Sequence, residues 1–203
     1  MYVIPSRKLL YLAQPKTGST SIGSYIRDEM RGQMVHVDVT PASREKLHHW
    51  APHHAADPDD VERYKREGYT AFTFVRNPWD YAVSWYHHRK GNRDPFPPFK
   101  EFLRSDEKGY GFLDQYNKDP NGNTGRIFWN LPFLADRVYQ FENLNHSLAD
   151  AFGMPGFELT RHAKKSDGRE HYSKYYDEED MEYIYRLACR DILDYGYEYV
   201  REP

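Results

Sequence analysis

The chain has 203 residues, the usual size of one compact domain, so we predict a single domain over residues 1–203. Its 28 lysines and arginines against 31 aspartates and glutamates give a net charge of −3, which argues against nucleic acid or an anionic membrane as a partner. The single cysteine, Cys189, excludes an intrachain disulfide, and no apolar run is long enough to span a membrane. With no signal-peptide pattern near Met1, we expect a reduced, cytoplasmic protein.

The first predicted unit consists of a strand, a polar loop and a helix. Residues 9–13 form a short apolar run, which is typical of a buried strand. A polar loop over residues 14–21 follows, and apolar residues at helical spacing then continue until Gly32. A further short strand is predicted over residues 35–39 because valines alternate there with polar residues.

The later elements alternate between helix and strand. An Asp-Pro pair begins a predicted helix over residues 57–68, residues 70–75 form the strongest predicted strand, and Asn77 with Pro78 begins the next helix. Further on, the patterns predict a short helix near residues 99–103, a strand at 138–141, a helix ending at Gly153, and a last helix from about Asp177 to Gly196. This alternation predicts an α/β fold of three layers, with a mainly parallel central sheet flanked by helices.

The loop between the first strand and helix has the composition of a phosphate site. A helix start offers backbone N–H groups and a favourable dipole to an anion. Gly18 allows close approach of the backbone, Lys16 adds a charge, and four hydroxyls add donors: Thr17, Ser19, Thr20 and Ser21. Because Lys16 precedes Gly18 and no glycine lies upstream in the loop, the loop departs from the nucleoside-triphosphatase pattern. A well-capped helix start with an incidental lysine is the alternative interpretation.

A second strand-to-helix junction repeats this arrangement. Arg76 ends the strand at residues 70–75, and open α/β sheets bind ligands at that end of their strands. Ser84 follows on the next helix, and a guanidinium with a hydroxyl so placed suits one phosphate group. The alternative is that Arg76 pairs with a carboxylate such as Asp80 while Ser84 is a surface residue.

Together the two junctions resemble those of sulfotransferases that use 3′-phosphoadenylyl sulfate (PAPS), and the family includes small bacterial and carbohydrate-type enzymes. Residues 15–21 (PKTGSTS) resemble the family's 5′-phosphosulfate loop, and residues 76–80 (RNPWD) with Ser84 resemble its 3′-phosphate element. Residues 138–144 and the tail from Tyr175 to Tyr197 are also similar to the family. The resemblance implies a P-loop-like fold.

The resemblance also implies site residues. The 5′-phosphosulfate would be held by the loop residues Lys16, Thr17, Gly18, Ser19, Thr20 and Ser21. The 3′-phosphate would be held by Arg76 and Ser84. A late basic segment, represented here by Lys164, Lys165 and Ser166, would close over the nucleotide.

The implied reaction is in-line transfer of a sulfuryl group from PAPS to an acceptor hydroxyl, with adenosine 3′,5′-bisphosphate (PAP) as product. Lys16 would stabilise the charge that builds on the leaving group in the transition state. A neutral histidine suits removal of the acceptor proton, and the family's spacing favours His54, with His53 as second choice. No metal is expected, although the histidine-rich segment over residues 48–56 leaves a zinc site as an alternative.

The acceptor is the part that the sequence leaves open. A carbohydrate is preferred, followed by a tyrosyl or phenolic hydroxyl and a small metabolite, and the oligomeric state is not predicted. Two other functions remain as alternatives. One is a P-loop kinase or other nucleotide phosphotransferase, and the other is a non-catalytic nucleotide- or glycan-binding module on the same fold.

Overall fold

The structure is a computed structural model, and it describes residues 1–35, 54, 56–91, 95–105, 125–128, 131–160 and 169–202. The chain divides into two compact units. The first comprises Met1–Val75 and Phe128–Lys164, and the second comprises Arg76–Ile127 and Lys165–Pro203. That these form one domain stays a prediction. Within the described ranges, no helix has the length and apolar character needed to cross a membrane.

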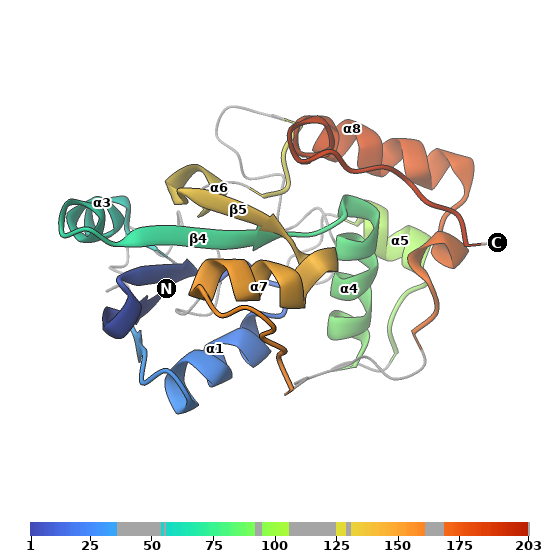
Figure 1. Cartoon of the computed structure of the whole chain (residues 1–203). Coiled ribbons are helices and arrows are strands. Elements are labelled where there is room, and N and C mark those ends of the chain that lie inside the picture. Colours follow the sequence, from blue (N-terminus) through green and yellow to red (C-terminus); the bar gives the residue numbers. More distant parts are fainter. Residues whose placement is uncertain are drawn as a thin grey trace. The chain divides into compact units, whose positions relative to one another are not determined.

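The first unit is built on a sheet in the order β3-β1-β2-β4-β5, counted over the described residues (Figure 1). The strands are β1 (Tyr2–Ile4), β2 (Leu9–Leu12), β3 (Gln33–Met34), β4 (Thr70–Val75) and β5 (Arg137–Gln140). β4 is parallel to β2 and β5, whereas β1 is antiparallel to β2 and β3. The sheet is therefore mixed, and the prediction of a mainly parallel sheet is not confirmed.

The antiparallel part follows from a short connection that the sequence patterns did not reveal. Only the 3-10 turn η1 (Pro5–Arg7) and Lys8 separate β1 from β2, and so short a connection reverses the chain instead of crossing over to a parallel strand. The strand predicted at residues 35–39 does not overlap β3, which ends at Met34; Val35 lies outside that strand, and residues 36–39 lie outside the described ranges.

Helices cover both faces of this sheet. Alternate residues of a strand point to opposite faces, so Tyr11 and Phe72 pack toward α1 and α7, while Leu10 and Ala71 pack toward α3 and α6 (Figure 1). The helices are α1 (Ser19–Asp28), α3 (Pro58–Arg66), α6 (Leu131–Leu134) and α7 (Leu144–Phe152). The expected three-layer arrangement of helices around a sheet therefore describes this unit.

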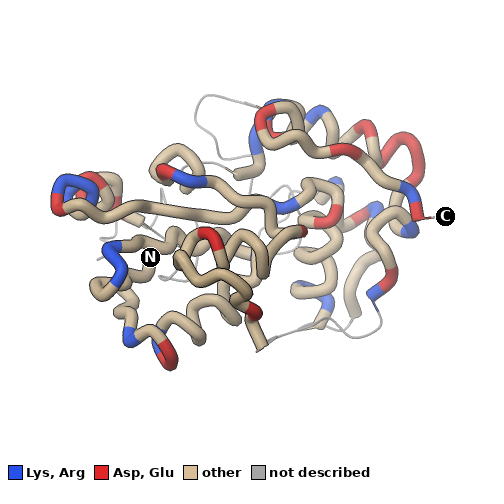
Figure 2. Tube along the Cα trace, in the orientation of Figure 1, with Lys and Arg blue, Asp and Glu red and all other residues tan. Residues whose placement is uncertain are grey.

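The second unit is helical in its described part. Its elements are α4 (Pro78–Lys90), α5 (Phe99–Arg104), the 3-10 turn η5 (Tyr172–Tyr175) and α8 (Glu178–Tyr195), with α4 in contact with the other three. The buried carboxylate of Asp191 on α8 accepts hydrogen bonds from Arg126 and from the Ile127 backbone, at 3.1 and 2.5 Å. Both α3 and α8 carry acidic residues in the first turn, and their basic residues come later along each helix (Figure 2).

Five predicted helix ends are confirmed by their capping residues, whereas α1 and α3 end at Asp28 and Arg66, before the predicted Gly32 and Gly68. Asn77 Oδ1 accepts the backbone N–H groups of Trp79 and Asp80 at 3.1 and 3.3 Å, and Asp57 and Asp177 cap α3 and α8 in the same way. At the other ends, Gly153 and Gly196 adopt the left-handed conformation that terminates α7 and α8. Local chemistry therefore defines these boundaries.

Candidate functional site

The carboxyl edge of the sheet collects the loops predicted to bind a ligand. β2, β4 and β5 are parallel, with Leu12 opposite Thr73 and Val75 opposite Gln140, so the three strands end at one edge. The predicted phosphate loop (residues 14–21) follows β2 there. Arg76 is the next residue after β4, and the 3-10 turn η4 (Phe141–Asn143) follows β5. This is the edge at which open α/β sheets bind ligands.

The phosphate loop has an unusual backbone at two positions. Lys16 and Gly18 both have positive φ, +60° and +74°, and Gly18 is the N-cap of α1. A positive φ is strained for a lysine, and strain of this kind concentrates at functional sites, where the surrounding structure holds it in place. The loop therefore turns tightly onto the start of α1, which presents its N-terminal N–H groups at the carboxyl edge.

The hydroxyls of this loop differ in their surroundings. Thr17 is fully buried, and its Oγ1 donates to the Gln14 carbonyl at 2.7 Å, which ties the loop to its own backbone. Ser19 and Ser21 are buried in the first turn of α1, and Thr20 is exposed. In this structure the side chain of Thr17 therefore stabilises the loop, and a ligand contact by this residue would come from its backbone.

Gly18 also lies against the end of β5. A Cβ at this position would come within 3.0 Å of Phe141 Cε2 in η4, in addition to the strain of the positive φ. Gly153 also has a positive φ, +61°, but nothing lies within 4 Å of a Cβ built there. A side chain at Gly153 would therefore strain the backbone without a close contact.

We therefore predict that Gly18→Ala lowers the free energy of unfolding by about 2–3 kcal/mol, from left-handed strain plus overpacking. Gly153→Ala is the matched control, with about 1 kcal/mol from strain alone. Urea denaturation followed by circular dichroism measures both. Equal losses would show that Phe141 adapts to the new methyl group and that the contact is unimportant.

His54 approaches the phosphate loop from a distant part of the sequence. Its Nδ1 lies 2.6 Å from the carbonyl oxygen of Ala13, the residue that separates β2 from the loop. A carbonyl only accepts, so Nδ1 carries the proton and the other ring nitrogen, Nε2, retains its lone pair in the neutral imidazole. The backbone thus fixes the tautomer that a general base requires.

In the second unit, Arg76 pairs with Asp80, the carboxylate that the sequence analysis named as the alternative to a phosphate partner. Its Nε and Nη2 donate to Asp80 Oδ2 at 2.7 and 2.6 Å. The other carboxylate oxygen, Oδ1, accepts from Nη2 of Arg169, a residue that the sequence analysis did not select. Burial and the charge of Arg76 lower the pKa of Arg169 to about 10, so Arg169 remains charged at neutral pH. Ser84 is buried, one helical turn beyond Asp80, and is not the surface residue of the alternative.

Several predicted residues lie outside the described ranges, namely His53, Lys164, Lys165 and Ser166. Their roles stay predictions. Among the residues that are described, no group of three histidine, cysteine or acidic side chains is placed to hold a metal ion. Much of the histidine-rich segment lies outside that part of the chain, so the zinc alternative is not tested.

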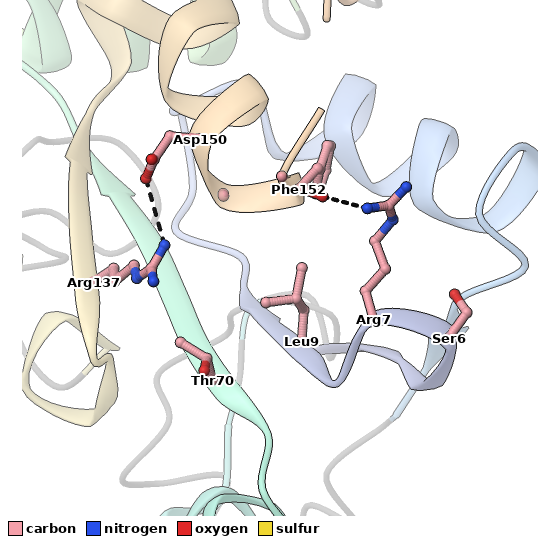
Figure 3. A pocket seen from close by; sticks show the side chains of 9 residues that line it. Ser6, Arg7, Leu9, Thr70, Arg137, Asp150 and Phe152 are labelled. Atoms are coloured by element: carbon pink, nitrogen blue, oxygen red, sulfur yellow. Dashed lines mark hydrogen bonds and ion pairs between the residues drawn. The ribbon is translucent and has the colours of Figure 1, made fainter. Parts of the chain in front are cut away.

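A surface pocket of about 450 Å³ lies at the opposite, amino edge of the same sheet (Figure 3). Its lining includes Arg7, Arg137 and Asp150 but none of the predicted site residues. Arg137 pairs with Asp150 at 3.5 Å, both side chains being more than half exposed, and Arg7 donates to the carbonyl of Phe152. Arg137 and Asp150 thus pair with each other and Arg7 is bonded to the backbone, so the pocket is a weaker candidate than the predicted phosphate loop.

The comparisons with known proteins identify the family of the chain. Searches of curated proteins and of solved structures found no match to this chain. The profile of the Sulfotransferase family, by contrast, matches residues 1–198, nearly the whole chain. Because this match spans both compact units and both strand-to-helix junctions, the chain belongs to the sulfotransferase family.

Proposed function

We propose that this protein transfers a sulfuryl group from PAPS to an acceptor hydroxyl. The observation that carries the proposal is the Lys16–Ser21 loop, which begins α1 at the carboxyl end of β2 in a chain of the sulfotransferase family. Its donor set suits a phosphosulfate, since an anion gains both from the helix N-terminus and from a lysine beside it. PAPS would supply an activated sulfuryl group, and the residues of the protein supply the remaining chemistry.

In this proposal the loop holds the 5′ end of the nucleotide. The backbone of residues 17–21, with the hydroxyls of Ser19, Thr20 and Ser21, donates hydrogen bonds to its oxygens. Lys16 places its ammonium where negative charge develops as the sulfur–oxygen bond breaks. A fixed cation there lowers the barrier because it interacts more strongly with the transition state than with the ground state.

His54 is proposed as the general base, with His53 as second choice. The hydrogen bond from Nδ1 to Ala13 supports this role because it leaves Nε2 as the proton acceptor. The acceptor substrate remains a carbohydrate by preference, followed by a phenol or a small metabolite. No metal is proposed, since the lysine and the loop donors take the part that Mg²⁺ plays in many phosphoryl transfers.

The 3′-phosphate is assigned to Arg76 and Ser84, with Lys164, Lys165 and Ser166 from the late basic segment. Calorimetric titration with PAP tests this assignment. We expect wild type to bind PAP and Arg76→Ala to bind it about 10–100-fold more weakly, because a charge-assisted hydrogen-bonding group is lost. Arg63→Ala, at an exposed ion pair on α3, is the control and should bind as wild type does.

The outcomes also separate the alternative functions. Absence of PAP binding by wild type, or undiminished binding by Arg76→Ala, contradicts the proposal. Mg²⁺-dependent binding of ATP would indicate a kinase or phosphotransferase instead. PAP binding without turnover of labelled PAPS in a crude extract, followed by a broad acceptor panel, would indicate a non-catalytic module. The molecule that becomes labelled in the extract identifies the acceptor.

A further inference from the structure

One carboxylate in the second unit is shared by two guanidiniums. Asp80 Oδ2 accepts from Nε and Nη2 of Arg76, and Asp80 Oδ1 accepts from Nη2 of Arg169. The side chains of Asp80, Arg76 and Arg169 are 19%, 10% and 17% exposed, so the cluster is largely withdrawn from water. Charges at such a site are weakly screened, and their arrangement has large consequences for a bound anion.

Asp80 is itself held in place. Its backbone N–H donates to the Asn77 cap at 3.3 Å, and its backbone carbonyl accepts from Arg169 Nη2 at 3.4 Å. It is the third residue of α4, and Ser84 follows one turn later on the same face. The carboxylate therefore has a fixed position from which it can orient the arginines on either side.

The two guanidiniums repel each other, and the carboxylate offsets that repulsion. Two positive groups and one negative group leave a net charge of +1, which still attracts a phosphate. Within the described part of the chain, every hydrogen bond of Arg169 is made through Nη2, so its Nε and Nη1 donors face no described protein acceptor. A guanidinium fixed at one corner with donors remaining is prepared to bind a further anion.

We propose that Asp80 is a positioning residue, which holds Arg76 and Arg169 side by side as a preformed binding pair for the 3′-phosphate. The inference rests on the proposed function and adds two residues to it. It predicts that loss of the Asp80 charge weakens the contribution of the 3′-phosphate to nucleotide affinity. A preformed pair avoids the cost of ordering two long side chains when the ligand binds.

A merely structural role for Asp80 is testable because α3 begins in the same way as α4. In α3, Asp57 and Pro58 precede Asp60, just as Asn77 and Pro78 precede Asp80. The carboxylate of Asp60 pairs with an exposed arginine, Arg63, at 2.9 Å. Asp60→Asn thus removes the same acid from the same helical position, without affecting the arginine pair.

The experiment is a calorimetric comparison of PAP with adenosine 5′-phosphate, which lacks the 3′-phosphate. The ratio of their affinities isolates the interaction with that group. For Asp80→Asn we expect the ratio to fall at least tenfold, whereas Asp60→Asn should keep the wild-type ratio. Arg169→Gln should lower the ratio as well, and adding Asp80→Asn to it should have much less effect than in wild type, because the two residues act as one unit.

Three outcomes overturn the inference. These are an unchanged or increased ratio in Asp80→Asn, an equal fall in Asp60→Asn, and fully additive effects of Asp80→Asn and Arg169→Gln. If Asp80→Asn does not fold, the Arg169→Gln ratio decides alone, and an unchanged ratio rejects the arginine pair. Failure of wild type to bind either nucleotide is a distinct result, which overturns the proposed function and, with it, this inference.

Discussion

Replacing Lys16 with methionine is expected to slow sulfuryl transfer by about 10²–10³-fold, the typical effect of losing one preorganised group at a developing negative charge. Affinity for PAP should fall less than tenfold, because the product lacks the sulfuryl group beside which Lys16 is proposed to lie. Methionine keeps most of the length of the lysine side chain, so the change removes mainly the charge. Single-turnover transfer of labelled sulfuryl to the acceptor found in the extract measures the rate.

Lys8 offers a matched control for this substitution. It is also a lysine with positive φ in the first unit, +53°, but its ammonium lies over the Tyr69 ring, 4.5 Å from the centroid. Lys8→Met should therefore transfer sulfuryl at close to the wild-type rate. If Lys16→Met lowers PAP affinity as much as it lowers the rate, Lys16 contributes uniform binding and does not selectively stabilise the transition state.

Replacing His54 with glutamine is the second change with a large expected effect, a loss of about 10²–10³-fold in transfer rate, as is typical for a general base. Glutamine retains an N–H donor for the Ala13 carbonyl, so the local contact can persist, but it has no basic nitrogen at neutral pH. The rise of the rate with pH that deprotonation of a catalytic histidine produces should also disappear. A pH–rate profile under single-turnover conditions measures both effects.

His146→Gln on the exposed surface of α7 serves as the control and should leave the rate and the profile unchanged. Wild-type activity in His54→Gln would reject His54 as the base without affecting the proposed function. In that event His53→Gln becomes the next variant to measure. Loss of PAP affinity in His54→Gln would indicate a distorted loop and not a lost base.

Much of the local structure follows from short-range patterns. The β-branched and aromatic content of residues 70–75 predicted β4 at its observed bounds, and Asn77 with Pro78 predicted the start of α4. These features depend on side chains within a few residues of the backbone groups that they satisfy, so a sequence window contains all the participants. The same holds for the phosphate loop, where the glycine, lysine and hydroxyls are adjacent.

The mixed sheet and α6 were not predicted, for different reasons. β1 has only three residues, Tyr2–Ile4, and becomes a strand because β2 and β3 flank it on either side. α6 has four residues, too few for a periodic apolar pattern to be recognised. Such short elements are stable only through contacts with neighbouring strands and helices.

By itself, the sequence determined the phosphate loop, the strand and helix around each junction, and the resemblance to sulfotransferases. Only the tertiary structure brought Arg169 to Asp80 across 89 residues and His54 to Ala13 across 41 residues. It also showed that Ser84 is buried, which excludes the alternative interpretation of Ser84 as a surface residue. The reason is that a charge pair or a carbonyl contact between distant residues has no spacing rule, because the fold alone sets which side chains meet.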